Sequence, residues 1–196
     1  MNQTKFRQLL LVAFALSGMT ALIYEVVWTR PLQMIFGSTI YAVSTMLTTF
    51  FVGFALGSYM FRNLAEKNPI RLFALLEFGI GLYGLIILSL FDILPPIYLS
   101  IADIPSLQFL LIFLVLIIPT TMFGAIWPIV NKAYIREIGS DAGRLYAFNS
   151  FGAAFGSLAA GFLLIPFLGI RNTSLLAVSV NLLITVFIYN YSRKIK

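Results

Sequence analysis

The sequence predicts an all-α, polytopic membrane helix bundle with six transmembrane helices and both termini in the cytoplasm. Of its 196 residues, 60% are hydrophobic and only 10% are charged, and the mean hydropathy is +0.97. A soluble domain would carry about 25% charged residues to cover its surface. The apolar residues also gather in runs of about 20, the helical length that crosses a bilayer core about 30 Å thick. Lipid is therefore the expected surroundings of this chain.

The six runs follow one another without a linker or a second domain. The first is uncharged over residues 8–24 and extends through Glu25 to Trp28, and the third is interrupted only by Glu77. The second follows an uncharged lead-in that starts at Pro31. The predicted spans are about 8–28, 40–61, 72–91, 107–130, 145–168 and 172–192.

The orientation follows from the distribution of basic residues, which favour the cytoplasmic side of a membrane. The two termini and the second and fourth loops hold eleven of the thirteen Lys and Arg residues: Lys5, Arg7, Arg62, Lys67, Arg71, Lys132, Arg136, Arg144, Arg193, Lys194 and Lys196. The opposite side holds Arg30 and Arg171. An even number of spans with both ends inside fits this pattern, and a bacterial cytoplasmic (inner) membrane is the expected location. A cleaved signal peptide at the N-terminus is the alternative, but its apolar core would be unusually long.

Missing residue types exclude several functions. The chain has no Cys and no His, so it offers no thiolate, no haem or zinc ligation by these side chains and no histidine acid–base catalysis. It also lacks a glycine-rich loop ending in Lys-Ser or Lys-Thr. We expect no cofactor, no metal and no enzymatic activity. The net charge of +6 reflects membrane topology rather than binding to nucleic acid.

Two short patterns recur in the two halves of the chain. Residues 36–42 contain Phe-Gly-Ser and then Ile-Tyr-Ala, and residues 138–147 contain Ile-Gly-Ser and then Leu-Tyr-Ala. The copies would have opposite orientations in the membrane, as in a 3+3 inverted repeat that resembles half of a major facilitator transporter. Their spacings differ by several residues, so coincidence is the alternative.

Small residues recur four apart in the second and fifth spans: Gly53 and Gly57, then Gly152, Gly156 and Ala160. Such stripes let helix backbones approach closely in lipid. Packing within the bundle is one interpretation, and a face for dimerisation is the other.

Glu77 and Asn149 are candidate binding residues inside the membrane. An ionisable side chain in the hydrocarbon region usually faces the bundle interior and a partner. Glu77 lies about 9 Å beyond Arg71, and Asn149 lies about 7 Å beyond Arg144. The similar depths would allow a hydrogen bond between them, and a backbone carbonyl is the alternative partner of Glu77. The contact would be structural or part of a site for a cation or proton. Asn181, near the middle of the sixth span, is expected to join two helices.

A second candidate group lies near the outer end of the first span. Glu25 could pair with Arg30 or Arg171 at the interface. Alternatively, Glu25, Tyr24 and Trp28 could line an entrance for an organic cation, because carboxylates and aromatic faces both attract amines.

Several runs resemble the membrane domain of bacterial spermidine synthase-like proteins. They are residues 22–30, 36–44, 53–58, 75–84 and 143–153, which include Glu25, Arg30, Glu77 and Asn149. In that family a facilitator-like membrane region often precedes a cytosolic domain that resembles aminopropyltransferases. The sequence stops at Lys196 without a recognisable strand–glycine-loop–helix unit, so the resemblance implies family membership without aminopropyl transfer by these residues.

Two functions follow from these observations. One is a transporter-like module, acting as a homodimer, that moves a polyamine or another organic cation. The other is a non-transporting membrane subunit that anchors a separately encoded spermidine synthase-like enzyme or belongs to a larger membrane complex. Neither substrate identity nor ion coupling follows from the sequence.

Overall fold

The computed structural model describes residues 3–66, 68–101, 104–135 and 137–194, and every regular element in them is helical. The long helices are α1 (Gln3–Phe36), α2 (Thr39–Phe61), α3 (Pro69–Ser100), α4 (Pro105–Tyr134), α5 (Ile138–Ala159) and α6 (Ile165–Lys194). A short 3-10 helix, η1 (Leu64–Glu66), follows α2, and a π turn, η2 (Ala160–Leu164), joins α5 to α6. Lys67, Arg136 and Lys196, which enter the topology prediction, lie outside the described residues.

Five helical segments are long and apolar enough to cross a membrane. They are Lys5–Met34, Ile40–Phe61, Pro69–Ser100, Pro105–Tyr134 and Ile138–Ser192. Their length and composition are those of a multi-pass membrane protein. The prediction of an all-α bundle is therefore confirmed, and the prediction of membrane-spanning helices is supported by these five segments.

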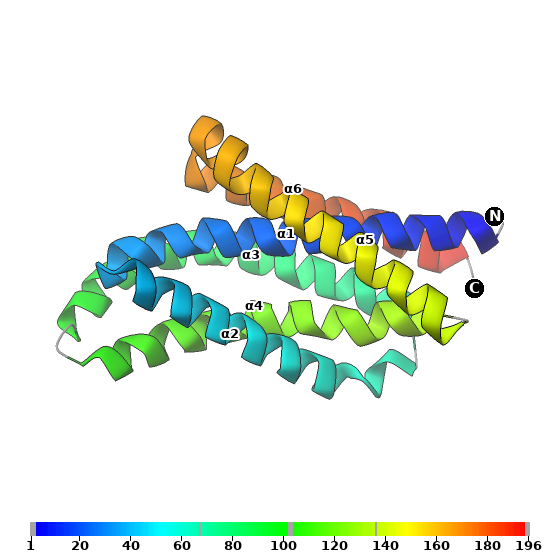
Figure 1. The fold of residues 1–196 in the computed structure, drawn as a ribbon, viewed down its shortest axis with the longest axis horizontal. Coiled ribbons are helices and arrows are strands. Elements are labelled where there is room, and N and C mark those ends of the chain that lie inside the picture. The colour runs from blue at the N-terminus through cyan, green and yellow to red at the C-terminus, as the bar shows by residue number, and fades with distance from the viewer. Residues whose placement is uncertain (1–2, 67, 102–103, 136, 195–196) are drawn as a thin grey trace.

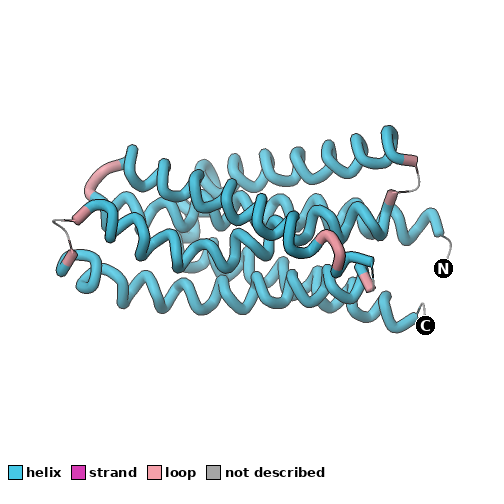
Figure 2. Tube along the Cα trace, turned by 90° about the horizontal axis from the view of Figure 1, so that it is seen from below, coloured by secondary structure: helices cyan, strands magenta, loops and turns pink. Residues whose placement is uncertain are grey.

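The helices lie side by side as one elongated bundle, with both termini at the same end (Figures 1 and 2). Three pairings dominate the contacts: α1 with α5, α2 with α4, and α3 with α6. Phe6 of α1 stacks on Tyr191 of α6 with ring centroids 4.5 Å apart. At the other end of α1, the ring of Phe36 lies 5.2 Å from that of Tyr98 on α3. Thus α3 runs parallel to α1, and the C-terminal part of α6 runs antiparallel to it.

Several helices are longer than the predicted spans. The first span was expected to end near Trp28, but α1 continues through Pro31 to Phe36. Likewise, α3 continues through Pro95 and Pro96 to Ser100, although the span was expected to end near residue 91. Hydropathy marks only the segment within the hydrocarbon, whereas a helix satisfies its own backbone and extends beyond that layer. At 1.5 Å per residue, the 34 residues of α1 span about 50 Å.

The longest apolar segment, Ile138–Ser192, changes direction at Gly169. This residue has φ 79° and ψ 169°, a conformation that is open almost only to glycine. Before it, Gly156 lies against Met19 of α1, and after it, Asn181 contacts Thr20 of the same helix. The chain therefore folds back on itself at Gly169, as Figure 1 shows for the turn that precedes most of α6.

The glycine stripes hold the helix pairs together within the chain. A Cβ on Gly152 would lie 2.0 Å from the Ala15 carbonyl oxygen, and one on Gly57 would lie 2.0 Å from that of Thr121. Gly156 and Gly53 are equally crowded by α1 and α4. These glycines thus pack α5 on α1 and α2 on α4, which confirms packing within the bundle. They are not available as a face for dimerisation.

Two prolines inside α4 free backbone carbonyls that neighbouring helices satisfy. Proline has no N–H, so Pro119 and Pro128 leave the carbonyls four residues earlier, Val115 and Gly124, without their helical partners. The hydroxyl of Tyr83 on α3 donates to Val115 O, and that of Ser58 on α2 donates to Gly124 O at 2.9 Å. Such substitution is what permits proline inside a helix surrounded by lipid.

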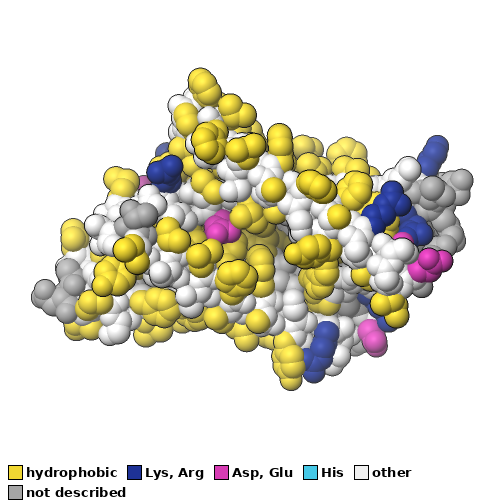
Figure 3. Space-filling model, in the orientation of Figure 1, with side chains coloured by type: hydrophobic (Ala, Val, Ile, Leu, Met, Phe, Trp, Pro, Cys, Tyr) yellow, Lys and Arg dark blue, Asp and Glu magenta, His cyan; other side chains and the backbone are white. Residues whose placement is uncertain are grey.

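The surface separates apolar and charged residues along the long axis. Apolar side chains cover much of the long sides, and many of the Lys and Arg side chains gather at the end that holds the termini (Figure 3). Arg62, Arg71, Lys132 and Arg144 are exposed near helix ends on this side. We call this end the terminal end.

Candidate functional site

Glu77 is the centre of a polar cluster inside the bundle. It lies on α3, and none of its surface is exposed. Gly81, one turn further along α3, packs against Asn181 and Leu182 of α6. The close α3–α6 packing thus places the carboxyl of Glu77 beside the amide of Asn181.

Asn181 connects Glu77 to α1 through three hydrogen bonds. Its Nδ2 donates to Glu77 Oε2 at 2.6 Å and to Thr20 Oγ1 at 3.1 Å. Its Oδ1 accepts a hydrogen bond of 3.0 Å from the hydroxyl of Tyr24. Thr20 in turn donates to the carbonyl of Ser17 at 2.9 Å. Asn181 therefore joins three helices, which confirms its expected role as a contact between helices and adds α1 to it.

The other carboxyl oxygen of Glu77, Oε1, has no partner with full hydrogen-bond geometry among the described residues. The side chain of Ser17 is close enough to interact with the carboxyl, so its hydroxyl is the candidate partner. No ion pair to Glu77 occurs in the described part of the chain. A buried carboxylate without a counter-ion is expensive, so this oxygen is a position where a proton or a cation would be stabilised.

The predicted hydrogen bond between Glu77 and Asn149 is wrong. Asn149 Nδ2 instead donates to the backbone carbonyl of Phe14 on α1 at 2.9 Å. Glu77 and Asn149 were expected to meet because they lie at similar depths along their helices. However, α5 packs on α1, whereas α3 packs on α6. Helix neighbours, rather than depth, decide which polar side chains meet.

A cavity of about 250 Å³ lies between α1, α2, α4 and α5. Its polar lining comes from Ser17, Ser58 and Asn149. Its aromatic lining comes from Phe14, Phe54, Phe123, Trp127 and Tyr146. Ser17 both lines this cavity and neighbours the Glu77 carboxyl, so it connects the two features. We call the cavity with Ser17 and Glu77 the central site.

The second candidate group is not an open entrance. Tyr24 and Trp28 are completely buried and stack on each other with centroids 4.8 Å apart, so they cannot line an entrance. Glu25 is half-buried and Arg30 is exposed. Glu25 forms no ion pair with Arg30 or Arg171 in the described structure. The α1 face that carries Tyr24 and Trp28 therefore packs into the core, and the candidate span in α1 is more buried than the other four.

A second cavity, of about 370 Å³, lies at the end away from the termini. Hydroxyl and amide side chains of α2 and α4 line it, including Ser44, Thr45, Thr48, Ser106 and Gln108. None of the described residues in its lining is acidic, so those residues suit a cation less well than the central site does.

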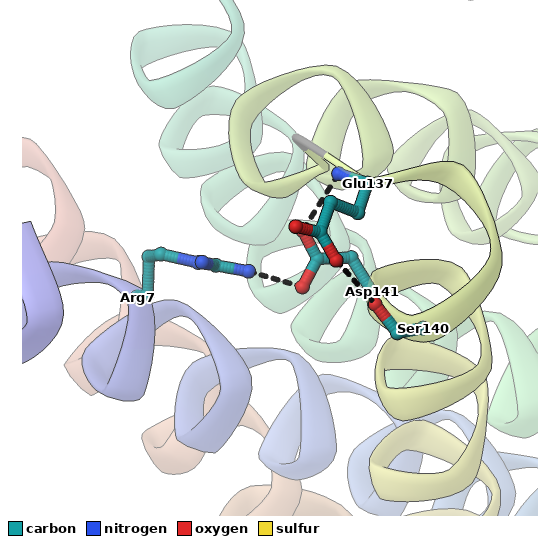
Figure 4. A network of polar contacts seen from close by, with 4 residues as sticks. All are labelled: Arg7, Glu137, Ser140 and Asp141. Carbon is teal, nitrogen blue, oxygen red and sulfur yellow. Dashed lines mark hydrogen bonds and ion pairs between the residues drawn. The ribbon is translucent and has the colours of Figure 1, made fainter.

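A polar network also links α1 to α5 at the terminal end (Figure 4). The guanidinium of Arg7 donates to Asp141 Oδ1, and the backbone N–H of Glu137 donates to Asp141 Oδ2 at 3.2 Å. Arg7 also lies over the ring of Tyr134, 4.5 Å from its centroid. This network fixes the start of α5 against α1.

Sequence reasoning missed Ser17 and Thr20 as members of the site. Ser17, Thr20 and Tyr24 are spaced three and four apart, which places them on one face of α1. That polar stripe within an apolar helix was the available signal. In comparisons with family models, curated proteins and solved structures, none matched this chain.

Proposed function

We propose that this chain is a six-span transport module for a small organic cation, with a polyamine as the expected substrate class. The observation that carries the proposal is the central site, where an aromatic cavity adjoins a buried and incompletely satisfied carboxyl. The resemblance to membrane domains of spermidine synthase-like proteins supports the choice of a polyamine.

Six crossings are the simplest interpretation of the five apolar segments. Ile138–Ser192 is 55 residues long, about twice the length that one crossing needs. Its reversal at Gly169 lies between the predicted spans 145–168 and 172–192. With six crossings, the basic terminal end faces the cytoplasm, and the protein resides in the bacterial inner membrane with both termini inside.

The helix pairings support the proposed inverted repeat. If α1, α2 and α3 correspond to α4, α5 and α6, the α1–α5 pair maps onto the α4–α2 pair, and the α3–α6 pair maps onto itself. All three are the dominant pairings. The glycines follow the same relation: Gly18 of α1 is crowded by α5, and Gly124 of α4 is crowded by α2. Both glycines line the central cavity, and substrate sites of such repeats lie at the repeat interface.

The cavity is suited to a slender cation. Its volume is slightly below the range of roughly 300–1,000 Å³ that is typical of ligand pockets. The faces of Trp127, Phe14 and Tyr146 would attract an ammonium group, and desolvation would strengthen this attraction to about 2 kcal/mol for each contact. A second copy of the chain would supply the other half of a facilitator-like transporter with twelve spans.

Uptake into liposomes tests the proposal. Purified protein in proteoliposomes should accumulate radiolabelled spermidine above empty liposomes, and Glu77→Gln should reduce uptake at least several-fold. Thr49→Val is the matched control, because Thr49 is also buried but bonds only to the carbonyl of Thr45 on its own helix. Uptake that is absent from wild type, or equal in Glu77→Gln, would contradict the proposal.

The alternative function is a docking subunit for a soluble enzyme. It is favoured by the exposed basic side chains at the terminal end, which would attract an acidic surface. Co-purification with a soluble spermidine synthase-like protein, lost on Arg62→Glu and Arg144→Glu, would support docking. Retention of spermidine uptake by that double variant would separate the two functions.

A further inference from the structure

We propose that Glu77 carries an exchangeable proton, which it releases into the central cavity when an organic cation binds there. The exchange rests on the proposed function, because that function supplies the cation. The protonation of Glu77 is argued from the geometry alone. The central site would then couple cation binding to proton release.

The surroundings of Glu77 favour the neutral acid in the absence of a ligand. The side chain is completely buried, and the described residues place no basic group within ion-pair distance. The two oxygens of the carboxyl have different surroundings. Oε2 accepts the short hydrogen bond from Asn181, as a carbonyl oxygen can, whereas Oε1 has no partner with full hydrogen-bond geometry in the described part of the chain and has only Ser17 as an interacting side chain besides Asn181. A proton on Oε1 makes the carboxyl neutral, and a neutral polar group costs less free energy to bury than a charged one.

Among the described side chains that interact with Glu77, none is a base that would hold this proton. From α1 the facing ionisable side chain is Tyr24, whose hydroxyl already donates to Asn181. From α6 the facing side chain is Asn181, an amide that does not titrate in the physiological range. Ser17 both interacts with the carboxyl and lines the cavity, so its hydroxyl offers the proton a route out.

Charge balance links the two events. Entry of a cation adds positive charge to a cavity whose described lining residues are all uncharged. Loss of the proton from Glu77 creates a carboxylate one side chain away, and Coulomb attraction between the two is strong in a medium of low dielectric constant. The carboxyl O–H bond breaks and its electron pair stays on Oε1; the Ser17 oxygen takes up this proton as the Ser17 O–H proton passes to water in the cavity, so the serine is left unchanged.

Two measurements on detergent-solubilised protein test the inference. N,N′-dicyclohexylcarbodiimide adds to protonated carboxyls in apolar surroundings, so mass spectrometry should find the adduct on Glu77. Saturating spermidine should reduce that labelling several-fold. In weakly buffered solution containing a pH dye, spermidine should release as many protons as molecules bound by calorimetry. Glu77→Gln should bind spermidine more weakly without releasing protons, and Thr49→Val should behave like wild type.

The outcomes separate this inference from the proposed function. Spermidine binding without proton release would overturn the exchange while leaving transport intact. Absence of the Glu77 adduct in the ligand-free protein would overturn its protonation. Failure of spermidine to bind would overturn the exchange together with the proposed function, and the adduct would still decide whether Glu77 holds a proton.

Discussion

Asn181 on α6 donates a hydrogen bond of 2.6 Å to Glu77 on α3, and neither side chain has any exposed surface. The same amide group also bonds to α1. One side chain thus satisfies polar groups of three helices inside an apolar bundle. Because buried polar groups are expensive when they lose their partners, this amide matters for stability as well as for the central site.

Replacing Asn181 should destabilise the bundle. Asn181→Leu leaves Glu77 Oε2 and the Tyr24 hydroxyl without their partner, at about 1–3 kcal/mol for each unsatisfied group. The midpoint of thermal unfolding in detergent should fall clearly. Ser179→Ala is the control on the same helix, because Ser179 is exposed and bonds only to Leu175 O. Equal midpoints for the two variants would contradict this role of Asn181.

The elements of the fold were predictable because lipid imposes simple requirements on them. Each apolar run had to be helical, since lipid offers no partner to an open backbone. The glycine spacings predicted close helix contacts, and Gly152 and Gly57 make them. Helix ends were less predictable. Hydropathy marks the part of a helix that suits lipid, but α1 continues beyond that part, from Trp28 to Phe36.

The central site was predictable only in part. Depth in the membrane identified Glu77 as a buried acid and Asn181 as a contact between helices. Depth carries no information about which helices are neighbours, so Asn149 was assigned to the wrong partner. The orientation of Tyr24 and Trp28 was missed for a related reason. Aromatic side chains near a helix end suit either the membrane–water interface or a protein core. The packing around α1 buries both Tyr24 and Trp28 in the core.

A methyl group on Gly156 should separate α5 from α1. The added Cβ would lie 2.2 Å from the Met19 carbonyl oxygen, and backbone cannot move aside as a flexible side chain can. Overpacking of this kind destabilises by about 1–3 kcal/mol. Gly143→Ala applies the same change to the same helix with nothing within 4 Å of the new Cβ. Thermal unfolding should distinguish the two variants, and a Gly156→Ala midpoint at or above that of Gly143→Ala would contradict the packing.

The ion pair between Arg7 and Asp141 should contribute to stability at the terminal end. Their side chains are 29% and 12% exposed, so solvent screens the pair only in part. A double-mutant cycle with Arg7→Gln and Asp141→Asn should give a coupling energy of about 1–3 kcal/mol, as for hydrogen bonds to charged groups. The Asp141→Asn variant retains an oxygen that can accept from the Glu137 N–H, so that hydrogen bond can be kept. Additive effects of the two substitutions would show that the pair contributes nothing.

The reversal at Gly169 should place the two ends of Ile138–Ser192 on the same side of the membrane. The sequence contains no cysteine, so single introduced cysteines can be labelled without background. A membrane-impermeant maleimide should label Asn172→Cys, next to the turn, in intact cells. It should label Ser140→Cys and Ser192→Cys only after permeabilisation, because both lie at the terminal end. Labelling of Asn172→Cys only after permeabilisation, together with the other two, would refute six crossings. Opposite accessibility of Ser140→Cys and Ser192→Cys would indicate a single crossing by this segment.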